Sequence, residues 1–253
     1  MSIDLSICQE ALNRDPVLYL DLTEAVRRGE GRLLAATPRG ALAAFHNYEK
    51  DGQDLGFTMF ADDLETAQAL LALIPPKPTF ITVHEALYRD ELEKRFGFTR
   101  LNPCWQMGWL RTTPPPLPDA ANIRQLDQSH LPTVLANYTL TDQEYLSWLI
   151  AHGELYGAFD GGTLMAFIGR HAEGSVGLLE VLPPYRRRGL ATLLQSYMIG
   201  LELSCGHVPY GQVFDGNDPS LALQRSLGMT LSMGRLYWAV RDDKPPRKEF
   251  FHG

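Results

Sequence analysis

The chain has 253 residues, of which 45% are apolar and 21% charged, the ordinary usage of a soluble globular protein. The net charge is −7, shared between the two halves, so neither half has the basic character of a nucleic-acid-binding protein. No apolar run approaches the roughly 20 residues that a membrane helix needs, and the acidic N-terminus lacks the basic start of a secretory signal.

The three cysteines lie far apart in the sequence, at Cys8, Cys104 and Cys205. They form neither a metal-binding knuckle nor a convincing disulfide framework. We therefore expect a cytoplasmic protein with reduced thiols, no metal, and no membrane or nucleic-acid partner.

The N-terminal half alternates short apolar strands with amphipathic helices. Strands are expected over 33–36, 41–45, 57–60, 80–83 and 105–109, and helices over 64–74 and 90–96. The stretch TTPPPLPDAAN over 112–122 follows, and its prolines lack backbone donors and favour an extended chain. We predict an N-terminal domain over 1–113, a linker over 114–121 and a C-terminal domain over 122–253.

The C-terminal half shows a stronger alternation of strands and helices. Strands are expected over 123–126, 155–159, 164–168, 176–181, 211–214 and 235–240, and helices over 129–137, 141–151, 190–203 and 219–226. Thr141 and Glu144 have the spacing of a capping box, which predicts that Thr141 begins its helix. Mixed strands and helices predict an α/β fold with a mixed sheet covered by helices.

A weak internal repeat relates the two halves. Residues 79–98 align without gaps on residues 210–229, at an offset of 131, and each segment reads strand, turn, amphipathic helix and glycine. This indicates a duplication. Coincidence is the alternative, because a glycine after a helix is a common C-cap.

The most informative segment follows the strand over 176–181. Two prolines, three arginines and Gly189 lead into the helix over 190–203. A helix N-terminus presents unpaired N–H groups and the positive end of its dipole, and Gly189 and Ala191 leave room for an anion. The pattern therefore predicts a pyrophosphate site.

This segment resembles a known family. Arg186-x-x-Gly189-x-Ala191 is similar to the Q/R-x-x-G-x-G/A signature of the GNAT superfamily of N-acetyltransferases, and residues 181–185 resemble its lead-in. Asn217-x-x-Ser220-x-x-Leu223, followed by residues 227–229, resembles a second family segment. The arginines look closest to the glycine N-acyltransferase-like branch. The resemblance covers about 122–241 and implies a GNAT-like fold, with the repeat suggesting two tandem copies.

The resemblance also implies a coenzyme site for acetyl-CoA or another acyl-CoA. The backbone of Leu179 and Val181 would pair with the pantetheine arm, and Asn217 would hydrogen-bond the coenzyme. Asn217 could instead, or also, be a plain helix N-cap. The pyrophosphate cradle would consist of Arg186, Arg187, Arg188, Gly189, Leu190 and Ala191.

The N-terminal half lacks such a loop. Three acids lie in Ala61-Asp62-Asp63-Leu64-Glu65, where a pyrophosphate would be repelled, and Ala86 stands at the place of Asn217 in the repeat. We expect this half to be a degenerate copy without a coenzyme site.

The catalytic residues are less clear. Gln224 and Gln212 stand where family members carry the general acid and the general base, and neither side chain can serve. Glu180 is the candidate base, because it interrupts an apolar strand next to the pantetheine-pairing residues. An outward-facing or salt-bridged glutamate is the alternative. Packing, turn or loop roles are favoured for Tyr185, Tyr197, Asp215 and His207, and core roles for the four tryptophans.

The sequence therefore predicts an N-acyltransferase, most simply an N-acetyltransferase, that moves an acyl group from acyl-CoA to a primary amine of a small molecule or amino acid. The alternative is a non-catalytic acyl-CoA sensor or interaction module. A monomer and a homodimer are both compatible with the sequence.

Overall fold

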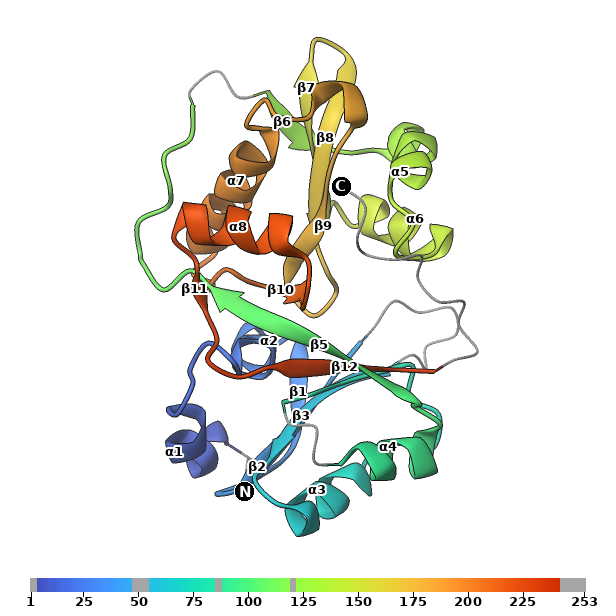
Figure 1. Ribbon diagram of the computed structural model, residues 1–253, viewed down its shortest axis with the longest axis vertical. Coiled ribbons are helices and arrows are strands. Elements are labelled where there is room, and N and C mark those ends of the chain that lie inside the picture. The colour runs from blue at the N-terminus through green and yellow to red at the C-terminus, as the bar shows by residue number, and fades with distance from the viewer. Residues whose placement is uncertain (1–3, 47–54, 85–87, 119–121, 242–253) are drawn as a thin grey trace.

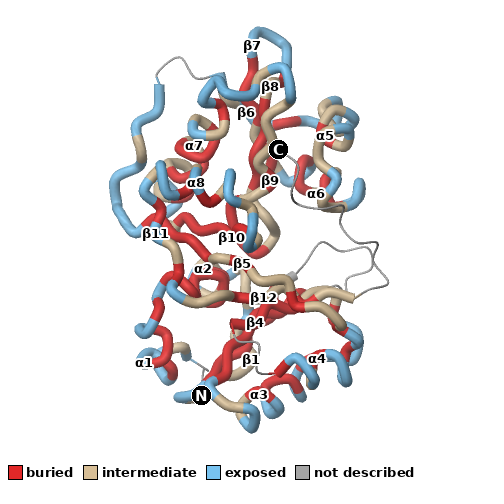
Figure 2. Tube along the Cα trace, viewed as in Figure 1, coloured by how far each residue is buried: buried red, intermediate tan, exposed pale blue. Residues whose placement is uncertain are grey.

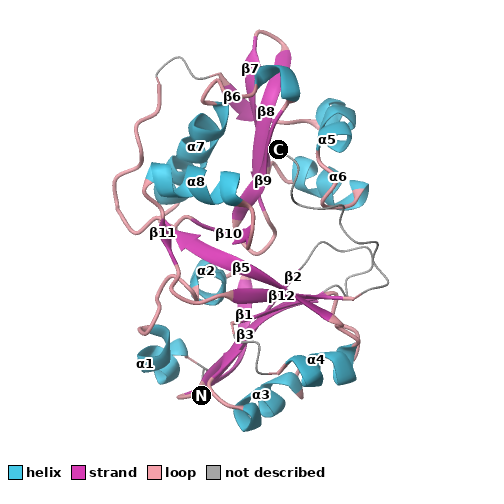
Figure 3. Ribbon diagram, viewed as in Figure 1, coloured by secondary structure: helices cyan, strands magenta, loops and turns pink. Residues whose placement is uncertain are grey.

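The computed structural model describes residues 4–46, 55–84, 88–118 and 122–241. Figure 1 shows two lobes stacked along the long axis, with the N-terminal half in one and most of the C-terminal half in the other. The expected mixed α/β architecture is confirmed, and Figure 3 shows helices on both faces of the C-terminal lobe's sheet.

The N-terminal lobe contains short helices and the first five strands. Its helices are η1 (Leu5–Cys8), α1 (Gln9–Leu12), α2 (Leu20–Arg28), α3 (Leu64–Leu71) and α4 (Arg89–Phe96). Its strands are β1 (Gly31–Thr37), β2 (Gly40–His46), β3 (Leu55–Ala61), β4 (Phe80–Val83) and β5 (Arg100–Gly108).

The C-terminal lobe begins after an irregular proline-rich segment, of which residues 119–121 lie outside the described ranges. The strands of the C-terminal half of the chain are β6 (Ile123–Gln125), β7 (Leu155–Asp160), β8 (Thr163–Arg170), β9 (Val176–Val181), β10 (Tyr210–Phe214), β11 (Thr230–Leu231) and β12 (Leu236–Val240). Its helices are η2 (Gln128–His130), α5 (Leu131–Asn137), α6 (Gln143–Ala151), η3 (Pro183–Tyr185), α7 (Leu190–Ser204) and α8 (Asp218–Leu227).

The strands form two sheets that do not follow the chain halves. One has four strands in the order β6-β7-β8-β9. The other has eight strands, in the order β1-β2-β3-β4-β12-β5-β10, with β11 also pairing with β5. Figure 2 shows buried backbone along the strands of both sheets, including β10 where the lobes meet.

Two strands cross between the lobes. β12, from the end of the chain, lies between β4 and β5, with Trp238 opposite Thr82 on one side and Asn102 on the other. The second half of β5 in turn pairs with β10 and β11, and Gly108 lies opposite both Tyr210 and Thr230. Backbone hydrogen bonds therefore cross the expected boundary between 1–113 and 122–253 in both directions.

Helices cover each sheet through separate apolar clusters. α5 and α6 pack on one face of β7 and β8 through residues such as Leu149 and Phe167, and α7 packs on the other face through Leu194 and Met198. A third cluster, which includes Ile199, joins α7 and α8 to β5 and β10. The crossover helix α7 thus touches both sheets.

Most expected elements are present near their expected bounds, and the strands over 80–83 and 176–181 agree to the residue. The Thr141 cap was wrong: Asp142 caps α6, accepting a hydrogen bond from the Tyr145 N–H, because its carboxylate is one position closer to the first turn. The expectation also missed α1, α2 and β11 and began β5 five residues late.

The two halves repeat the same order of elements around the aligned segments. β4 and α4 in one half correspond to β10 and α8 in the other. Each helix ends at a glycine in the left-handed region, Gly97 with φ 70° and Gly228 with φ 87°, whose N–H groups bond back to the last turn.

A buried polar pair lies inside the N-terminal lobe. Asp21 of α2 accepts from His84 Nε2 at 2.7 Å, while His84 Nδ1 lies 2.9 Å from the Met59 carbonyl. Both ring nitrogens face acceptors, so the ring is an imidazolium paired with a carboxylate. Burial alone would raise the pKa of Asp21, but His84, Thr58 and Thr82 together hold it below its ordinary value.

Replacing one member of this pair should destabilise the fold. Asp21→Asn leaves the buried His84 without its counter-charge, and we expect a loss of about 3–5 kcal/mol in the free energy of unfolding, measured by urea titration at pH 7. Because the pKa of Asp21 is lowered, the difference from wild type should persist at neutral pH and shrink as the pH falls below about 3.9.

The control for this prediction is Asp62→Asn. Asp62 forms an ion pair with Arg14 at the surface, where a pair contributes less than about 1 kcal/mol. Equal losses from the two substitutions would contradict a charged Asp21–His84 pair.

Candidate functional site

The edges of β9 and β10 define the candidate site. β9 is the last strand of the four-stranded sheet and β10 the last of the eight-stranded path, and no hydrogen-bonded ladder joins them within the described ranges. They approach each other at their first residues, since a Cβ on Gly211 would lie 2.5 Å from the Val176 carbonyl oxygen. We call this arrangement the β9–β10 junction.

A bulge shapes β9 at its centre. Leu178 has φ 58°, unusual for a branched side chain, and the register with β8 shifts between Phe167 and Gly169. Leu178 packs in the cluster of α5 and α6, whereas Leu179 and Val181 pack in the cluster of α7.

The register also determines which backbone groups of β9 point away from β8. The Leu182 N–H bonds to Met165, so Val181 and Ala166 form a non-hydrogen-bonded pair. The N–H and C=O of Val181 therefore point away from β8, toward the edge that faces β10. Leu179, two residues earlier, lies on the same face of β9 as Val181, since both pack in the cluster of α7.

The loop after β9 leads to an uncapped helix. η3 is followed by three exposed arginines, and Arg187 with φ 64° and Gly189 with φ 77° both take the left-handed conformation. α7 begins at Leu190, and no side chain caps it in the part of the chain described. A Cβ on Gly189 would meet no atom within 4 Å. The first-turn N–H groups of α7 thus face open space lined by positive charge.

The arginines differ in what they contact. The Arg186 guanidinium donates to the Val181 carbonyl at 3.1 Å and pairs with Glu180 at 3.2 Å. Arg188 lies over the Tyr185 ring, 5.4 Å from its centroid. Arg186 therefore ties the loop to the end of β9.

The equivalent helix of the N-terminal lobe is capped by its own carboxylate. Asp63 accepts from the Thr66 N–H at 2.8 Å and pairs with Arg39 at 2.9 Å. The Thr66 backbone hydrogen bond lowers the pKa of Asp63. A side chain of the N-terminal lobe therefore caps the start of α3, whereas no described side chain caps the start of α7. Ala86 lies outside the described residues.

Asn217 lies at the turn between β10 and α8, and its side chain accepts from the Ser220 N–H at 3.2 Å. The N-cap interpretation is therefore confirmed, while contact with a coenzyme stays a prediction. Beside it, Asp215 accepts from the Trp105 indole at 3.2 Å, with Arg235 stacked over that ring.

Glu180 is partly buried and salt-bridged to Arg186, as the alternative interpretation held. Its alternation with Leu179 and Val181 places it on the opposite face of β9 from the α7 cluster. Burial raises the pKa of Glu180 above its ordinary value, although the Arg186 hydrogen bond opposes this shift. A raised pKa makes a carboxylate a stronger base than an ordinary one.

The two glutamines at the usual catalytic positions have structural partners. Gln212 accepts a hydrogen bond from the Trp238 indole of β12. Gln224 is buried between α7 and α8 and donates to Gln195 at 3.3 Å. Tyr197 lies beside Tyr156 on the face of α7 that packs on the sheet, as its core interpretation held. His207 lies in the loop after α7, as expected, and its side chain pairs with Glu202 at 3.1 Å.

Nothing in the sequence indicated that β5 pairs with β10 beside the site. β5 supplies the hydrogen-bonding neighbour of β10, with Gln106 opposite Gln212. In the sequence, each half ends in a strand that looks like the last strand of that half. This pattern does not reveal that the last strands are exchanged between the halves.

Residues 155–239 match the model of the FR47-like protein family. No curated protein sequence matches the chain. A putative GNAT acetyltransferase from Novosphingobium aromaticivorans has a similar structure, with TM-score 0.54 and 21% identity over 88% of this chain and 95% of that one.

Two further solved structures are similar. A GCN5-related N-acetyltransferase-like protein from Streptococcus suis has TM-score 0.53 and 17% identity over 92% of this chain and all of that one. A Drosophila protein has TM-score 0.59 and 19% identity over 79% of this chain and 74% of that one. The chain has a GNAT-like fold.

The described residues contain neither a candidate metal cluster nor a candidate membrane-spanning helix. No group of three or more histidine, cysteine, aspartate or glutamate side chains there could hold a metal ion. No helix there is long and apolar enough to cross a membrane.

A charge at the start of α7 should block an anionic ligand. Gly189→Asp and Gly189→Asn have nearly equal shapes, and both residue types tolerate the left-handed conformation. We expect the aspartate variant to bind acetyl-CoA at least about tenfold more weakly than the asparagine variant, measured by calorimetry, because only its charge repels phosphate. Equal affinities would remove the phosphate-cradle assignment.

Proposed function

We propose that the protein is an acyl-CoA-dependent N-acyltransferase acting on a primary amine of a small molecule or amino acid. The observation that carries this proposal is the uncapped, arginine-flanked start of α7 directly after the unpaired edge of β9. The FR47-like match and the GNAT-like fold support it.

The residues present fit acyl-CoA. The first-turn N–H groups of α7, the cradle over 186–191 and the absence of any atom near a Gly189 Cβ suit a pyrophosphate. The backbone of Leu179 and Val181 would hold the pantetheine arm, and Asn217 would add a contact from the next turn. When bound, acetyl-CoA supplies an activated acetyl group.

The side chains of this protein would accept a proton and position the reacting groups. In the proposed reaction, Glu180 accepts the proton of the incoming ammonium at its carboxylate, and a raised pKa favours this transfer. Arg186 orients that carboxylate and the end of β9. Holding amine and thioester together would supply the larger part of the rate, since orientation alone can lower a barrier by several kcal/mol.

We further propose that the N-terminal half is a degenerate copy without a coenzyme site. The matching element order and the Asp63-capped α3 support this. On this proposal the chain, as a monomer or a homodimer, has one coenzyme site, in the segment over 122–241. The cytoplasmic location and the glycine N-acyltransferase-like branch remain predictions.

A non-catalytic acyl-CoA sensor is the second candidate. Gln212 and Gln224 favour it, because both amides are occupied by Trp238 and Gln195 and neither can donate a proton as an acid. The two functions share the coenzyme site and differ in the release of free CoA thiol.

The test combines binding with turnover. Calorimetry with acetyl-CoA and longer acyl-CoA would establish the ligand, and a thiol-release assay over amines, amino acids and polyamines would establish transfer. Binding with amine-dependent thiol release supports the enzyme. Binding without release from any amine supports the sensor, and absence of binding contradicts both.

Replacement of Glu180 tests its role as the base. Glu180→Gln keeps the hydrogen-bonding shape and removes the basicity, so kcat should fall by about 10²-fold or more. Acetyl-CoA affinity should stay nearly unchanged, because the contacts proposed for β9 are backbone ones. In wild type, kcat/KM should fall as the pH drops through the raised pKa of Glu180, where the carboxylate becomes protonated.

Arg186→Lys is the companion variant, since it keeps a positive charge beside Glu180 but loses the two-pronged contact with Glu180 and Val181.

An unchanged kcat in Glu180→Gln would show that Glu180 is structural and that another group or water carries the proton.

A further inference from the structure

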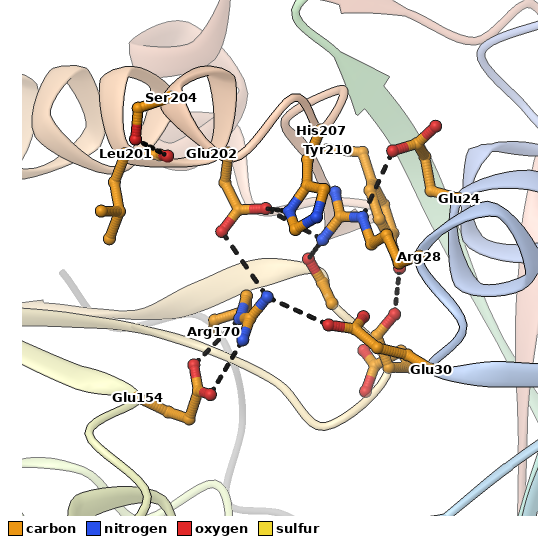
Figure 4. Close-up of polar contacts among 12 residues, drawn as sticks. Glu24, Arg28, Glu30, Glu154, Arg170, Leu201, Glu202, Ser204, His207 and Tyr210 are labelled. Atoms are coloured by element: carbon orange, nitrogen blue, oxygen red, sulfur yellow. Dashed lines mark hydrogen bonds and ion pairs between the residues drawn. The ribbon is translucent and has the colours of Figure 1, made fainter.

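A cluster of buried charges joins the two lobes. Figure 4 shows Arg28 of α2 and Glu30 reaching from the N-terminal lobe toward Arg170, Glu202 and His207 of the C-terminal lobe. The Arg28 side chain has no exposed surface, and that of Glu202 is 3% exposed. Burying charged groups is costly unless they are paired, so their arrangement has to be well satisfied.

The single side chain of Arg28 contacts three separate segments of the C-terminal lobe. Its guanidinium donates to the Gly174 carbonyl at 3.0 Å and to the Val208 carbonyl at 2.8 Å. It also pairs with Glu202 at 2.9 Å and with Glu24 on its own helix at 3.2 Å. Glu24 in turn accepts from the Val208 N–H at 2.9 Å.

These segments lie at the end of the β9–β10 junction where the two strands approach each other, which we call its closed end. Gly174 lies two residues before β9, Val208 two residues before β10, and Glu202 in the last turn of α7. The strands meet just beyond, where Gly211 approaches the Val176 carbonyl.

A second arginine ties the same region to the N-terminal lobe. Arg170, at the end of β8, pairs with Glu30 at 3.1 Å and with both oxygens of Glu154 at 2.9 Å. The Tyr210 hydroxyl donates to the Glu173 carbonyl, which links the start of β10 to the turn before β9. The closed end is therefore held by side chains from both lobes.

We propose that Arg28 is a positioning residue for the coenzyme site: it holds the starts of β9 and β10 together at one end, so that their edges stay apart and unpaired at the other. The inference rests on the proposed function. It gives the N-terminal lobe a role in coenzyme binding although Asp63 caps the start of its helix α3.

Arginine suits this task better than lysine. Its planar fork presents five donors in fixed directions, and here it reaches two carbonyls and two carboxylates. A lysine ammonium keeps the charge but offers three donors from one point, so it cannot reach all four groups. Arg28→Lys should therefore preserve the charge balance while loosening the link between the two strand starts.

The matched control is Arg27→Lys, the same substitution one residue earlier. Arg27 is half exposed and pairs with Glu24 at 2.5 Å within α2. Both variants keep the net charge, and only Arg28 reaches Gly174 and Val208.

The experiment measures acetyl-CoA affinity of the full chain by calorimetry, well below the unfolding temperature of each variant. We expect Arg28→Lys to raise Kd at least about tenfold and Arg27→Lys to leave it within about twofold. Hydrogen exchange of the coenzyme-free protein should be faster over 176–179 and 210–214 in Arg28→Lys alone.

A second pair of variants serves if Arg28→Lys does not fold. Gly174 has φ 93°, and a Cβ there would lie 2.6 Å from the Arg28 guanidinium. Gly161, in the turn between β7 and β8, has φ 56° and no atom within 4 Å of a Cβ. Gly174→Ala should displace Arg28 and weaken binding, whereas Gly161→Ala shares only the backbone strain.

The outcomes separate this inference from the proposed function. A lower unfolding temperature with unchanged Kd and unchanged exchange would make Arg28 a stabilising residue only and overturn the inference. Equal Kd values for the two alanine variants would overturn it as well. If the wild-type chain binds no acyl-CoA, the proposed function fails and the positioning role falls with it.

Discussion

The hydrogen bonding of β5 determines how the rest of the molecule is arranged. Its first half pairs with β12 and its second half with β10 and β11, so a single nine-residue strand serves both lobes. β10 is thereby drawn into the sheet of the N-terminal lobe, while β9 stays in the sheet of the C-terminal lobe. The unpaired edges at the β9–β10 junction follow from this division. The two halves of the chain are consequently not independent units, because β10, β11 and β12 of the C-terminal half belong to the same sheet as β1 to β5.

Helix α2 carries two buried charge systems along one face, one near its start and one near its end. Asp21 points into the N-terminal lobe and pairs with His84, which follows β4. Glu24 and Arg28, one and two turns later, point toward the C-terminal lobe. Buried ion pairs often stabilise no better than apolar packing, but they fix a geometry, since a shift of either partner leaves a charge without compensation. The buried charges of α2 thus link His84 after β4 to the last turn of α7 and to the segment before β10.

The same helix shows why part of the fold escapes prediction from sequence. Its buried residues include Asp21 and Glu24 beside Leu22, so the apolar periodicity that marks α7 is broken in α2. Most elements of the C-terminal half and the turn that precedes α7 could be predicted because they depend on local signals: Gly189, the prolines and the helical stripe from Leu190. The exchange of β5 and β12 could not, because it depends on contacts between residues more than 100 positions apart, such as Asn102 and Trp238.

The starts of α3 and α7 show how one fold position can have opposite electrostatics. At α3, Asp63 satisfies the Thr66 N–H and is itself balanced by Arg39, so the helix dipole is neutralised from within the lobe. At α7, Gly189 has no side chain to do this, and the flanking arginines add positive charge instead of removing it. An unsatisfied helix start with added cations is unfavourable for an isolated fold and favourable for an anionic ligand, whose binding recovers the lost interactions. The opposite end of the same helix is held to the N-terminal lobe, because Arg28 pairs with Glu202 in its last turn.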